Sequence, residues 1–532
     1  MLRFTKISVV FLLVLVLFSC RKDFERANWD VDLLAPLIKT SLNLQDLLPD
    51  SVLQTNPDTS LKIVYEKNIF DVNVDSLFKI PDTTITEIYS IPLSSTVAPG
   101  DSFYSEAKEY SLNVSNGVGL NYAEIESGFI EVEIFSEIKE KVIVTYTIPS
   151  ATKNGDTLVL KDIINAASPG VPAYYSKKID MSGYVLDLTG ISKAKINTLV
   201  TRAVGVVDTN ATSSVTLTIG EKITFNNKLI DIVPYFVRGY FGQQQFSYSD
   251  TTQFNAFSHI ASGSLDLEQV NVDLEFRNGI GVDAQLLMKQ FGTANTNTSQ
   301  NAMLSHSIMN TPININRSQL TGNIPEVNYT SYSINLNTNN SNIDQLIEIF
   351  PNQLLYDIDL TINPLGNISG YNDFVYKKHV LETNLKVEFP LSLIASSLTL
   401  QDTVDFSLPD QAETGRIIDG TLFLFANNGF PLDATISLNL YDENNGFLGT
   451  LPVNDYIKAA PVNSSLRVSS KRESVLSIPL SAATVDKLYE AKKIVLNIAF
   501  TTQPQSQFLK IYEEYAIDIQ LVGDFQYNLS LK

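Results

Sequence analysis

The sequence predicts a mostly β protein: tandem antiparallel β-sandwich modules, each with one short helix, preceded by a signal peptide. Apolar and polar residues alternate, as at Leu61, Ile63 and Tyr65, with the period of half-buried strands. Tyr and Phe, which favour strands, number 23 and 28 among 532 residues. Asn445-Gly446 is typical of a hairpin turn. An internal repeat then divides the chain into modules.

The first nineteen residues have the three parts of a secretory signal peptide. Arg3 and Lys6 precede an apolar run over residues 7–18, and the small Ser19 stands before Cys20. The run is shorter than the roughly 20 apolar residues of a membrane span. Residues 17–20 resemble a bacterial lipobox, in which the cysteine is lipidated, by palmitate among other chains, and becomes the first mature residue. We expect a signal peptide over 1–19 and lipidation at Cys20; cleavage without lipidation and an uncleaved anchor are the alternatives.

Cys20 is the only cysteine of the chain. An internal disulfide is therefore impossible, and the fold must depend on core packing. One acyl chain binds a bilayer only marginally, whereas several chains hold a protein stably. We therefore expect the body to be attached to a membrane through this N-terminal lipid.

Composition excludes one class of partner. The net charge of −20 argues against a nucleic-acid-binding surface, which needs clustered Lys and Arg. A chain of this length is expected to form two to four domains. Because no apolar stretch after residue 20 is long enough to span a bilayer, we expect the remainder to be soluble.

The residues after Cys20 bear on localisation and packing. The charged stretch 21–26 resembles the cell-surface export signal of Bacteroidota lipoproteins, which implies an outer-membrane, surface-exposed protein; the periplasmic face is the alternative. Residues 28–49 contain the only tryptophan, Trp29, and are too apolar for a simple tether. We expect them to pack against the first module, or against a partner, with one helical turn over Asn43–Leu48 before Pro49.

A short motif repeats within the chain. Asn278–Ala284 parallels Asn428–Ala434, 150 residues later, and each copy follows an alternating apolar strand. A degenerate third copy begins at Gly128. The Asn-Gly step predicts a strand-to-strand corner with positive φ, in preference to a ligand loop.

Later parts of the three units also correspond. Each has a helix candidate that opens on a serine able to cap it, followed by an apolar strand. The candidates are Ser192–Leu199, Ser341–Phe350 and Ser481–Ala491, and the strands are 199–207, 354–362 and 494–501. We therefore predict a lipidated N-terminus, linker and packing segment over 20–60, an N-terminal β region over 61–127, and β-sandwich modules over 128–260, 261–415 and 416–532.

Catalytic and metal-binding patterns are absent from the sequence. His259, His306 and His379 are far apart and form no zinc-binding helix pair. There is no Gly-x-Ser-x-Gly elbow, phosphate-binding glycine loop or cysteine nucleophile. Asp442–Gly446 has calcium-loop oxygens without the twelve-residue pattern, so a hairpin turn is preferred. We predict a protein that is not an enzyme, with no cofactor and no metal site; its ligand-binding residues are unknown.

Three segments carry a family resemblance: Asn363–Val375, Glu388–Ser392 and Asp402–Asp405. Together with the lipobox and the Asn-Gly turns, they resemble uncharacterised outer-membrane and surface lipoproteins of Bacteroidota. The resemblance implies location and architecture, and no catalytic residue.

Two functions remain open. The first is a non-catalytic structural or interaction role with an envelope protein partner, as an accessory subunit of an outer-membrane barrel assembly, transport or secretion complex. The alternative is surface glycan or ligand binding, as in adhesins or nutrient capture. Tyr235, Phe236, Tyr240 and Phe241 could supply an aromatic stacking platform for this function, although their spacing also suits a strand that crosses from core to surface.

Overall fold

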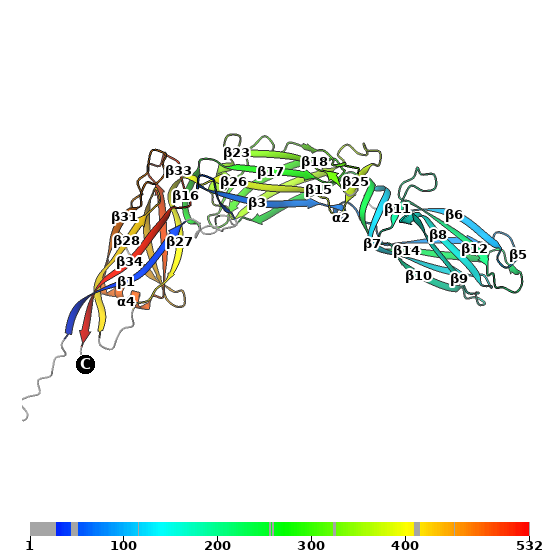
Figure 1. Cartoon of the computed structure of the whole chain (residues 1–532), viewed down its shortest axis with the longest axis horizontal. Coiled ribbons are helices and arrows are strands. Elements are labelled where there is room, and N and C mark those ends of the chain that lie inside the picture. Colours follow the sequence, from blue (N-terminus) through cyan, green and yellow to red (C-terminus); the bar gives the residue numbers. More distant parts are fainter. Residues whose placement is uncertain are drawn as a thin grey trace, which may run out of the picture. The chain divides into compact units, whose positions relative to one another are not determined.

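A computed structural model describes residues 28–43, 52–114, 116–254, 257, 260–322, 326–408, 415–451 and 453–530. The predicted signal peptide, Cys20, His259 and most of the predicted helical turn after Asn43 lie outside the described residues. The described chain is mostly β, as predicted, and its strands pair antiparallel (Figure 1). It divides into two compact units. Unit 1 contains Met1–Ile63, Asn255–Gln269 and Phe389–Lys532, and unit 2 contains Val64–Phe254 and Val270–Glu388.

Unit 1 is built mainly from two sheets. The first has the order β1 (Asn28–Asn43), β34 (Ala516–Ser530), β28 (Gly415–Asn428) and β31 (Arg472–Leu480). The second has the order β16 (Ile260–Leu267), β27 (Ser392–Asp405), β32 (Lys493–Thr502), β29 (Leu432–Tyr441) and β30 (Phe447–Leu451), with β33 (Leu509–Lys510) paired to β27. The short β2 (Leu53–Thr55) pairs with the start of β3 (Leu61–Val72).

Unit 2 contains most of the remaining strands. Its largest sheet has the order β25 (Asp373–Tyr376), β14 (Lys222–Tyr240), β7 (Gly119–Ser136), β11 (Val185–Asp187), β8 (Val142–Lys153), β12 (Thr198–Val207) and β6 (Ser102–Ser111). Three further strands join this sheet: β10 (Ala173–Asp180) on β7, β4 (Thr83–Ser90) on β14, and β9 (Asp156–Ile164) on β8.

Smaller sheets complete the strand pairing. One has the order β15 (Gln244–Gln253), β24 (Gln353–Ile362), β18 (Ala284–Asn295) and β19 (Gln300–Met303), with β20 (Ile313–Ile315) on β18. Another joins β3, β26 (Leu381–Pro390), β17 (Asn271–Asn278) and β23 (Thr330–Asn337). Two-stranded ribbons pair β5 (Ser95–Val97) with β13 (Val215–Leu217), and β21 (Gln319–Leu320) with β22 (Val327–Asn328).

The strands bury alternate side chains. In β17 and β32 every second residue is buried and the residues between are half-buried, so one face of each strand forms core and the other faces outward. The largest wholly buried side chains include Tyr146 and Phe225 in unit 2 and Phe430 and Phe525 in unit 1. The alternation expected from the sequence is therefore the pattern that builds both cores.

Three helices occur among the described residues: α2 (Val74–Leu77), α3 (Ile343–Glu348) and α4 (Ala482–Glu490). Helices are confirmed within 341–350 and 481–491, and Ser481 Oγ caps α4 by accepting a hydrogen bond from the Thr484 amide. The cap predicted at Ser341 is wrong, because the N-cap residue of α3 is Asn342 and Ser341 Oγ donates to the Asn337 carbonyl instead. The helix predicted at Ser192–Leu199 is wrong. Lys193 and Asn197 have φ of 56° and 50°, which breaks a helix, and β12 already begins at Thr198.

The same corner geometry follows three long strands. At the end of β17, Asn278 Oδ1 accepts from the Ile280 amide at 3.0 Å; at the end of β28, Asn428 Oδ1 accepts from the Phe430 amide at 2.9 Å. At the end of β7, Ser136 Oγ accepts from the Ile138 amide at 3.3 Å. In each corner the intervening residue donates its amide to the carbonyl at or beside the start of another strand: Gly279 to Val380, Gly429 to Ala516, and Glu137 to Lys222.

The positive φ predicted at the Asn-Gly corners is wrong, because neither glycine lies in the left-handed region. Glycine is needed there for close approach instead. A Cβ atom on Gly429 would lie 2.6 Å from the carbonyl oxygen of Ala516, and one on Gly279 would lie 2.4 Å from the Tyr329 ring. Each segment is a corner between strands, as the sequence predicts.

Strands from the N-terminal part of the chain pair with strands far along it. β1 pairs with β34 from Asn28 opposite Ser530 to Asn43 opposite Ala516, and Figure 1 shows these first and last strands side by side in blue and red. In unit 2, β4 pairs with β14 and β6 pairs with β12. β7 runs across the predicted boundary between residues 127 and 128. Neither unit is therefore one continuous stretch of sequence.

Candidate functional site

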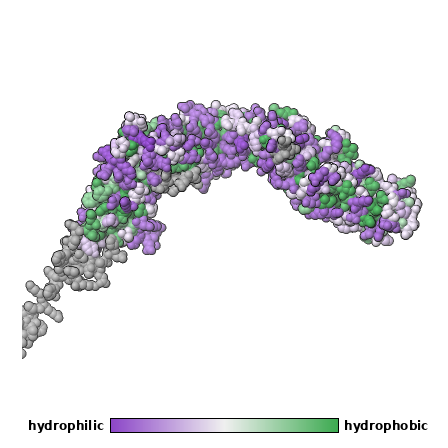
Figure 2. Space-filling view, in the orientation of Figure 1, coloured by the Kyte–Doolittle hydropathy of each residue, from purple (hydrophilic) through white to green (hydrophobic). Residues whose placement is uncertain are grey.

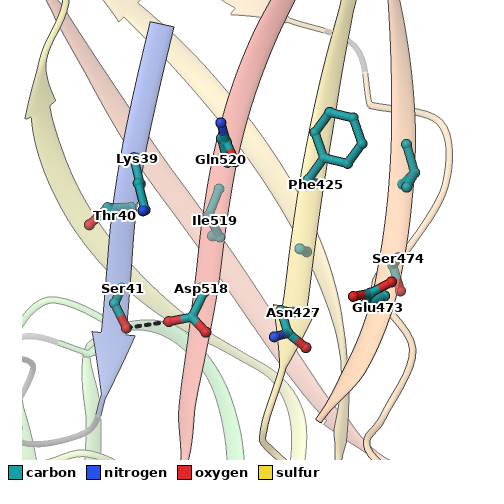
Figure 3. Close-up of a pocket in the computed structure, with 12 residues that line it drawn as sticks. Lys39, Thr40, Ser41, Phe425, Asn427, Glu473, Ser474, Asp518, Ile519 and Gln520 are labelled. Atoms are coloured by element: carbon teal, nitrogen blue, oxygen red, sulfur yellow. Dashed lines mark hydrogen bonds between the residues drawn. The ribbon is translucent and has the colours of Figure 1, made fainter. Parts of the chain in front are cut away.

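A groove on the outer face of the four-stranded sheet of unit 1 is the best-defined candidate site. It is a hollow of about 730 Å³ lined by residues of β1, β34, β28 and β31 (Figure 3). Because side chains alternate along each strand, buried residues such as Leu42 and Ile517 point into the core while their neighbours Ser41 and Asp518 point into the groove. The sheet therefore fixes the positions of the lining side chains.

The first row of lining residues is polar and crosses all four strands. Strand register places Ser41 opposite Asp518, Asp518 opposite Asn427, and Asn427 opposite Glu473. Figure 3 shows these four side chains in a line across the sheet. Directly opposite residues of an antiparallel pair have Cβ atoms about 5 Å apart, so neighbouring groups of the row can contact the same small ligand.

The second row combines one aromatic ring with polar and aliphatic neighbours. Lys39 lies opposite Gln520, Gln520 opposite Phe425, and Phe425 opposite Val475. The side chains of Phe425 and Val475 are apolar, yet the residues are 43% and 56% exposed. Such exposed apolar side chains within a hollow are available to a ligand.

Asp518 is the electrostatic centre of the groove. Its carboxylate accepts a hydrogen bond from Ser41 Oγ at 2.7 Å and forms an ion pair with Lys471 Nζ at 2.6 Å. The hydrogen bond from Lys471 lowers the pKa of Asp518 below its ordinary value, so the carboxyl is ionised at neutral pH. By contrast, the side chains of Asn427, Gln520 and Glu473 have no hydrogen-bond partner among the described residues.

These groups suit binding. Amide and carboxylate groups without partners provide hydrogen-bond donors and acceptors beside an exposed ring. In the part of the chain that the structure describes, no cluster of three or more His, Cys, Asp or Glu side chains is placed to hold a metal ion. Nor does any described helix have the length and apolar character needed to cross a bilayer.

The structure disperses the residues that the sequence suggested as sites. The predicted aromatic platform is wrong, because Phe236 and Phe241 are wholly buried and Tyr235 and Tyr240 are half-buried beside them in unit 2. Phe236 instead packs on Tyr376, with ring centroids 4.4 Å apart. Tyr235, Phe236 and Tyr240 belong to β14, which agrees with the other interpretation of their spacing, a strand that crosses from core to surface.

The other predicted positions have structural roles where they are described. His306 Nδ1 accepts from the Ile308 amide in a turn, and His379 Nδ1 bonds to the Tyr329 hydroxyl. The Asp442–Gly446 segment is a hairpin turn, as predicted. Asp442 Oδ1 accepts from the amides of Asn444 and Gly446, so the turn itself occupies that oxygen.

A buried carboxylate in unit 2 escaped sequence reasoning. Glu87 is 1% exposed and accepts hydrogen bonds from the Tyr89 and Tyr146 hydroxyls at 2.7 and 2.6 Å. Thr201 Oγ1 and Asn227 Nδ2 donate to it at 3.1 and 2.8 Å. Burial raises the pKa of Glu87 above its ordinary value. Because its own donors enclose the carboxylate, we interpret this network as part of the core.

Unit 2 also exposes apolar side chains. Val159, Ile163 and Tyr174 of β9 and β10 are 55%, 48% and 58% exposed, and Figure 2 shows hydrophobic residues among hydrophilic ones over the strands around β8 and β9. Lys161 is exposed between Val159 and Ile163 on the same face of β9, so charge interrupts the apolar surface. The groove of unit 1 is therefore the stronger candidate.

Comparisons with known proteins assign no family. No protein-family model matches the chain, and no curated protein matches it. Among solved structures, the chain is similar to a putative secreted protein from Parabacteroides distasonis, with 15% identity, a TM-score of 0.27, and coverage of 53% of this chain and 82% of that one. It is also similar to the VP2 subviral particle of infectious bursal disease virus, with 9% identity, a TM-score of 0.10, and coverage of 91% and 85%. At these TM-scores neither similarity supports an inference about fold or function.

Proposed function

We propose that the protein is a lipid-anchored, non-catalytic interaction protein of the cell envelope. In this proposal Cys20 carries the lipid, and the body lies on the outer membrane at the cell surface. It acts there as an accessory subunit of a barrel assembly, transport or secretion complex of a Bacteroidota-type envelope.

The observation that carries the proposal is the placement of β1. Eight residues after the predicted lipidation site the chain enters a strand that is paired with β34 from Asn28 to Asn43, apart from a register shift between Pro36 and Ile38. Those eight residues can span at most about 28 Å. A lipid on Cys20 would therefore hold unit 1, together with its groove, close to the membrane surface, where envelope partners and surface ligands are found.

We also propose that the chain consists of three β-sandwich modules that arose by duplication. The three corners after β7, β17 and β28 support this, because each has the same side-chain bond to the second amide and the same backbone bond to another strand. Because these two hydrogen bonds recur together in all three corners, a common origin is favoured over coincidence.

Replacement of Cys20 tests the anchor. Cys20→Ala removes the only thiol that can be acylated, so the protein should leave the membrane fraction without loss of fold. Ser19→Ala is the matched control, because a small residue before the cysteine is retained. Cell fractionation with immunoblotting measures both variants. Persistence of Cys20→Ala in the membrane through detergent-free washes would show attachment by protein contacts instead.

Affinity purification tests the partner. From detergent-solubilised outer membranes, the tagged protein should recover a barrel protein in a stoichiometric amount. Quantitative mass spectrometry of the eluate makes this measurement. Recovery of the lipoprotein alone would remove the proposed accessory role.

Surface ligand binding remains a second candidate function because of the groove. Its exposed ring and unpaired amide and carboxylate groups form a site at which a ligand can bind without any barrel partner. Here the groove of unit 1 replaces the aromatic platform that the sequence suggested in unit 2.

A further inference from the structure

We propose that the groove of unit 1 binds a neutral saccharide, with Phe425 as the stacking platform. The inference rests on the second candidate function, ligand binding, and does not require that Cys20 be lipidated. It assigns the ligand class from three properties of the groove: its exposed ring, its row of hydrogen-bonding groups and its balanced charge.

The exposed ring provides a flat apolar surface. Phe425 projects from the central strand β28, and its neighbours across the sheet are Val475 on one side and Gln520 on the other. A pyranose ring has one face of C–H groups, whose slightly positive hydrogens suit the negative face of an aromatic ring. A saccharide lying on Phe425 would thus cover the ring and keep its hydroxyl groups at the edge.

The polar row lies one step along the same strands. Asn427 is two residues from Phe425, so both side chains are on the same face of β28, about 7 Å apart along the strand. Glu473 and Asp518 flank Asn427 on the two neighbouring strands. Amides donate and accept, and carboxylates accept, which matches hydroxyl groups that both donate and accept.

The charges of the groove favour a neutral ligand. Three charged residues line the groove: Lys39, Glu473 and Asp518. Lys471, which lies outside the lining, pairs with Asp518, and Lys39 has the opposite charge to Glu473. The groove is thus near neutrality in a chain whose net charge is −20. A strongly anionic ligand would meet the carboxylates of Glu473 and Asp518, and a cationic ligand would meet the amine of Lys39, whereas a neutral polyhydroxylated ligand has no such cost.

Titration calorimetry provides the test. The detergent-solubilised full-length protein is titrated with neutral oligomers of glucose, xylose, mannose and N-acetylglucosamine. We expect binding of at least one of them, weakened about tenfold or more by Phe425→Ala. Phe447→Ala is the matched control, because Phe447 is also an exposed phenylalanine of unit 1, 61% exposed, but lies outside the groove. Its affinity should equal that of the wild type.

Further variants separate stacking from folding. Phe425→Tyr retains an aromatic face and should retain most of the affinity, while Asn427→Ala and Gln520→Ala should each weaken binding several-fold. Equal melting temperatures show that the variants are folded. Membrane attachment and barrel recovery should be unchanged in Phe425→Ala, so failure of this inference is distinguishable from failure of the anchor or of the complex.

Four results would overturn the proposal. They are the absence of binding to every neutral oligomer, preference for sulfated or uronic-acid oligomers, equal losses in Phe425→Ala and Phe447→Ala, and concentration-dependent self-association through the groove that Phe425→Ala abolishes. The last would assign the groove to a second copy of the chain.

Discussion

Single buried side chains hold the strand corners, and Asn428 shows how much one residue contributes. It is wholly buried, donates to the carbonyls of Leu432 and Lys458 at 2.9 and 3.0 Å, and accepts from the Phe430 amide. Asn428→Ala leaves these backbone groups without a partner. Because each buried unpaired group costs about 1–3 kcal/mol, we expect the free energy of unfolding to fall by about 2–4 kcal/mol, measured by urea denaturation.

The adjacent residue is the control for this prediction. The side chain of Asn427 faces the groove and has no hydrogen bond to another described residue, so Asn427→Ala should change stability by less than about 0.5 kcal/mol. Equal effects of the two substitutions would contradict the role given to the corner. Asn278 makes the corresponding bonds to Val282 and Asn316 in unit 2, so Asn278→Ala should destabilise to a similar extent.

The buried Glu87 predicts a dependence of stability on pH. Burial raises its pKa in the folded state, so the folded protein binds this proton more tightly than the unfolded chain does. The stability that this provides is present below the ordinary pKa of glutamate and is lost as the pH rises through the raised pKa. Glu87→Gln stays neutral and can keep the bonds from Tyr146 and Asn227. The variant should therefore gain stability relative to the wild type between acidic and neutral pH.

Thermal unfolding across this pH range measures the difference. Glu443→Gln is the control for the loss of one carboxylate, since Glu443 is exposed in a turn. Parallel profiles for Glu87→Gln and the wild type would show that folding does not change the pKa of the Glu87 carboxyl.

Asn428 and Glu87 show how far single residues could be interpreted from the sequence. The Asn-Gly corners were found because a short motif recurs, but the conformation assigned to them was wrong, since the asparagine side chain makes the turn without a positive φ. The Glu87 network has no local signal. Its donors Tyr146 and Asn227 come from strands 59 and 140 residues away along the chain.

At the scale of elements, β1 is an edge strand that depends on buried contacts on one face. Leu42 is 5% exposed and Leu34 is 72% exposed. Replacement of each leucine by serine therefore compares the buried face of β1 with its exposed face. Leu42→Ser should remove about 2–4 kcal/mol of the free energy that holds β1 in place, because the buried packing of this side chain is lost. Hydrogen exchange followed by mass spectrometry should then show at least tenfold faster exchange in β1, with unit 2 unchanged.

Leu34→Ser should leave the exchange of β1 unaltered, because that side chain already faces water. If both variants exchanged alike, the strand would be held by its ladder with β34 alone. Slow exchange of β1 in Leu42→Ser would contradict the importance of its buried face.

The positions of strands along the chain were predicted more successfully than which strands pair with each other. Alternation located strands such as β24 and β32, and Ser481 indicated where α4 begins. The failed helix at Ser192–Leu199 has the same serine, but Asn197 bonds to the Val118 carbonyl and the Leu120 amide, which draws the segment into a turn. Such competition depends on a distant strand and is invisible locally.

At the scale of the whole molecule, chain order and spatial order differ. Unit 1 is assembled from three separate stretches and unit 2 from two. Sequence reasoning divides a chain at points along its length, so it cannot reveal that β1 joins β34 across nearly 500 residues. The groove could not be predicted from the sequence for the same reason. Its lining comes from four strands that are neighbours in the sheet but not in the chain.

The proposed location of the whole molecule is tested by labelling lysines in intact cells. Lys139 of unit 2 has a side chain that is 74% exposed, with its amine 3.4 Å from Glu221. If the body is on the cell surface, a membrane-impermeant amine reagent should modify Lys139 in intact cells as fully as in cells with a breached outer membrane. Peptide mass spectrometry measures the modified fraction, and Lys139→Arg, which keeps the charge, should lose that label only. Modification that requires a breached outer membrane would place the body on the periplasmic face instead.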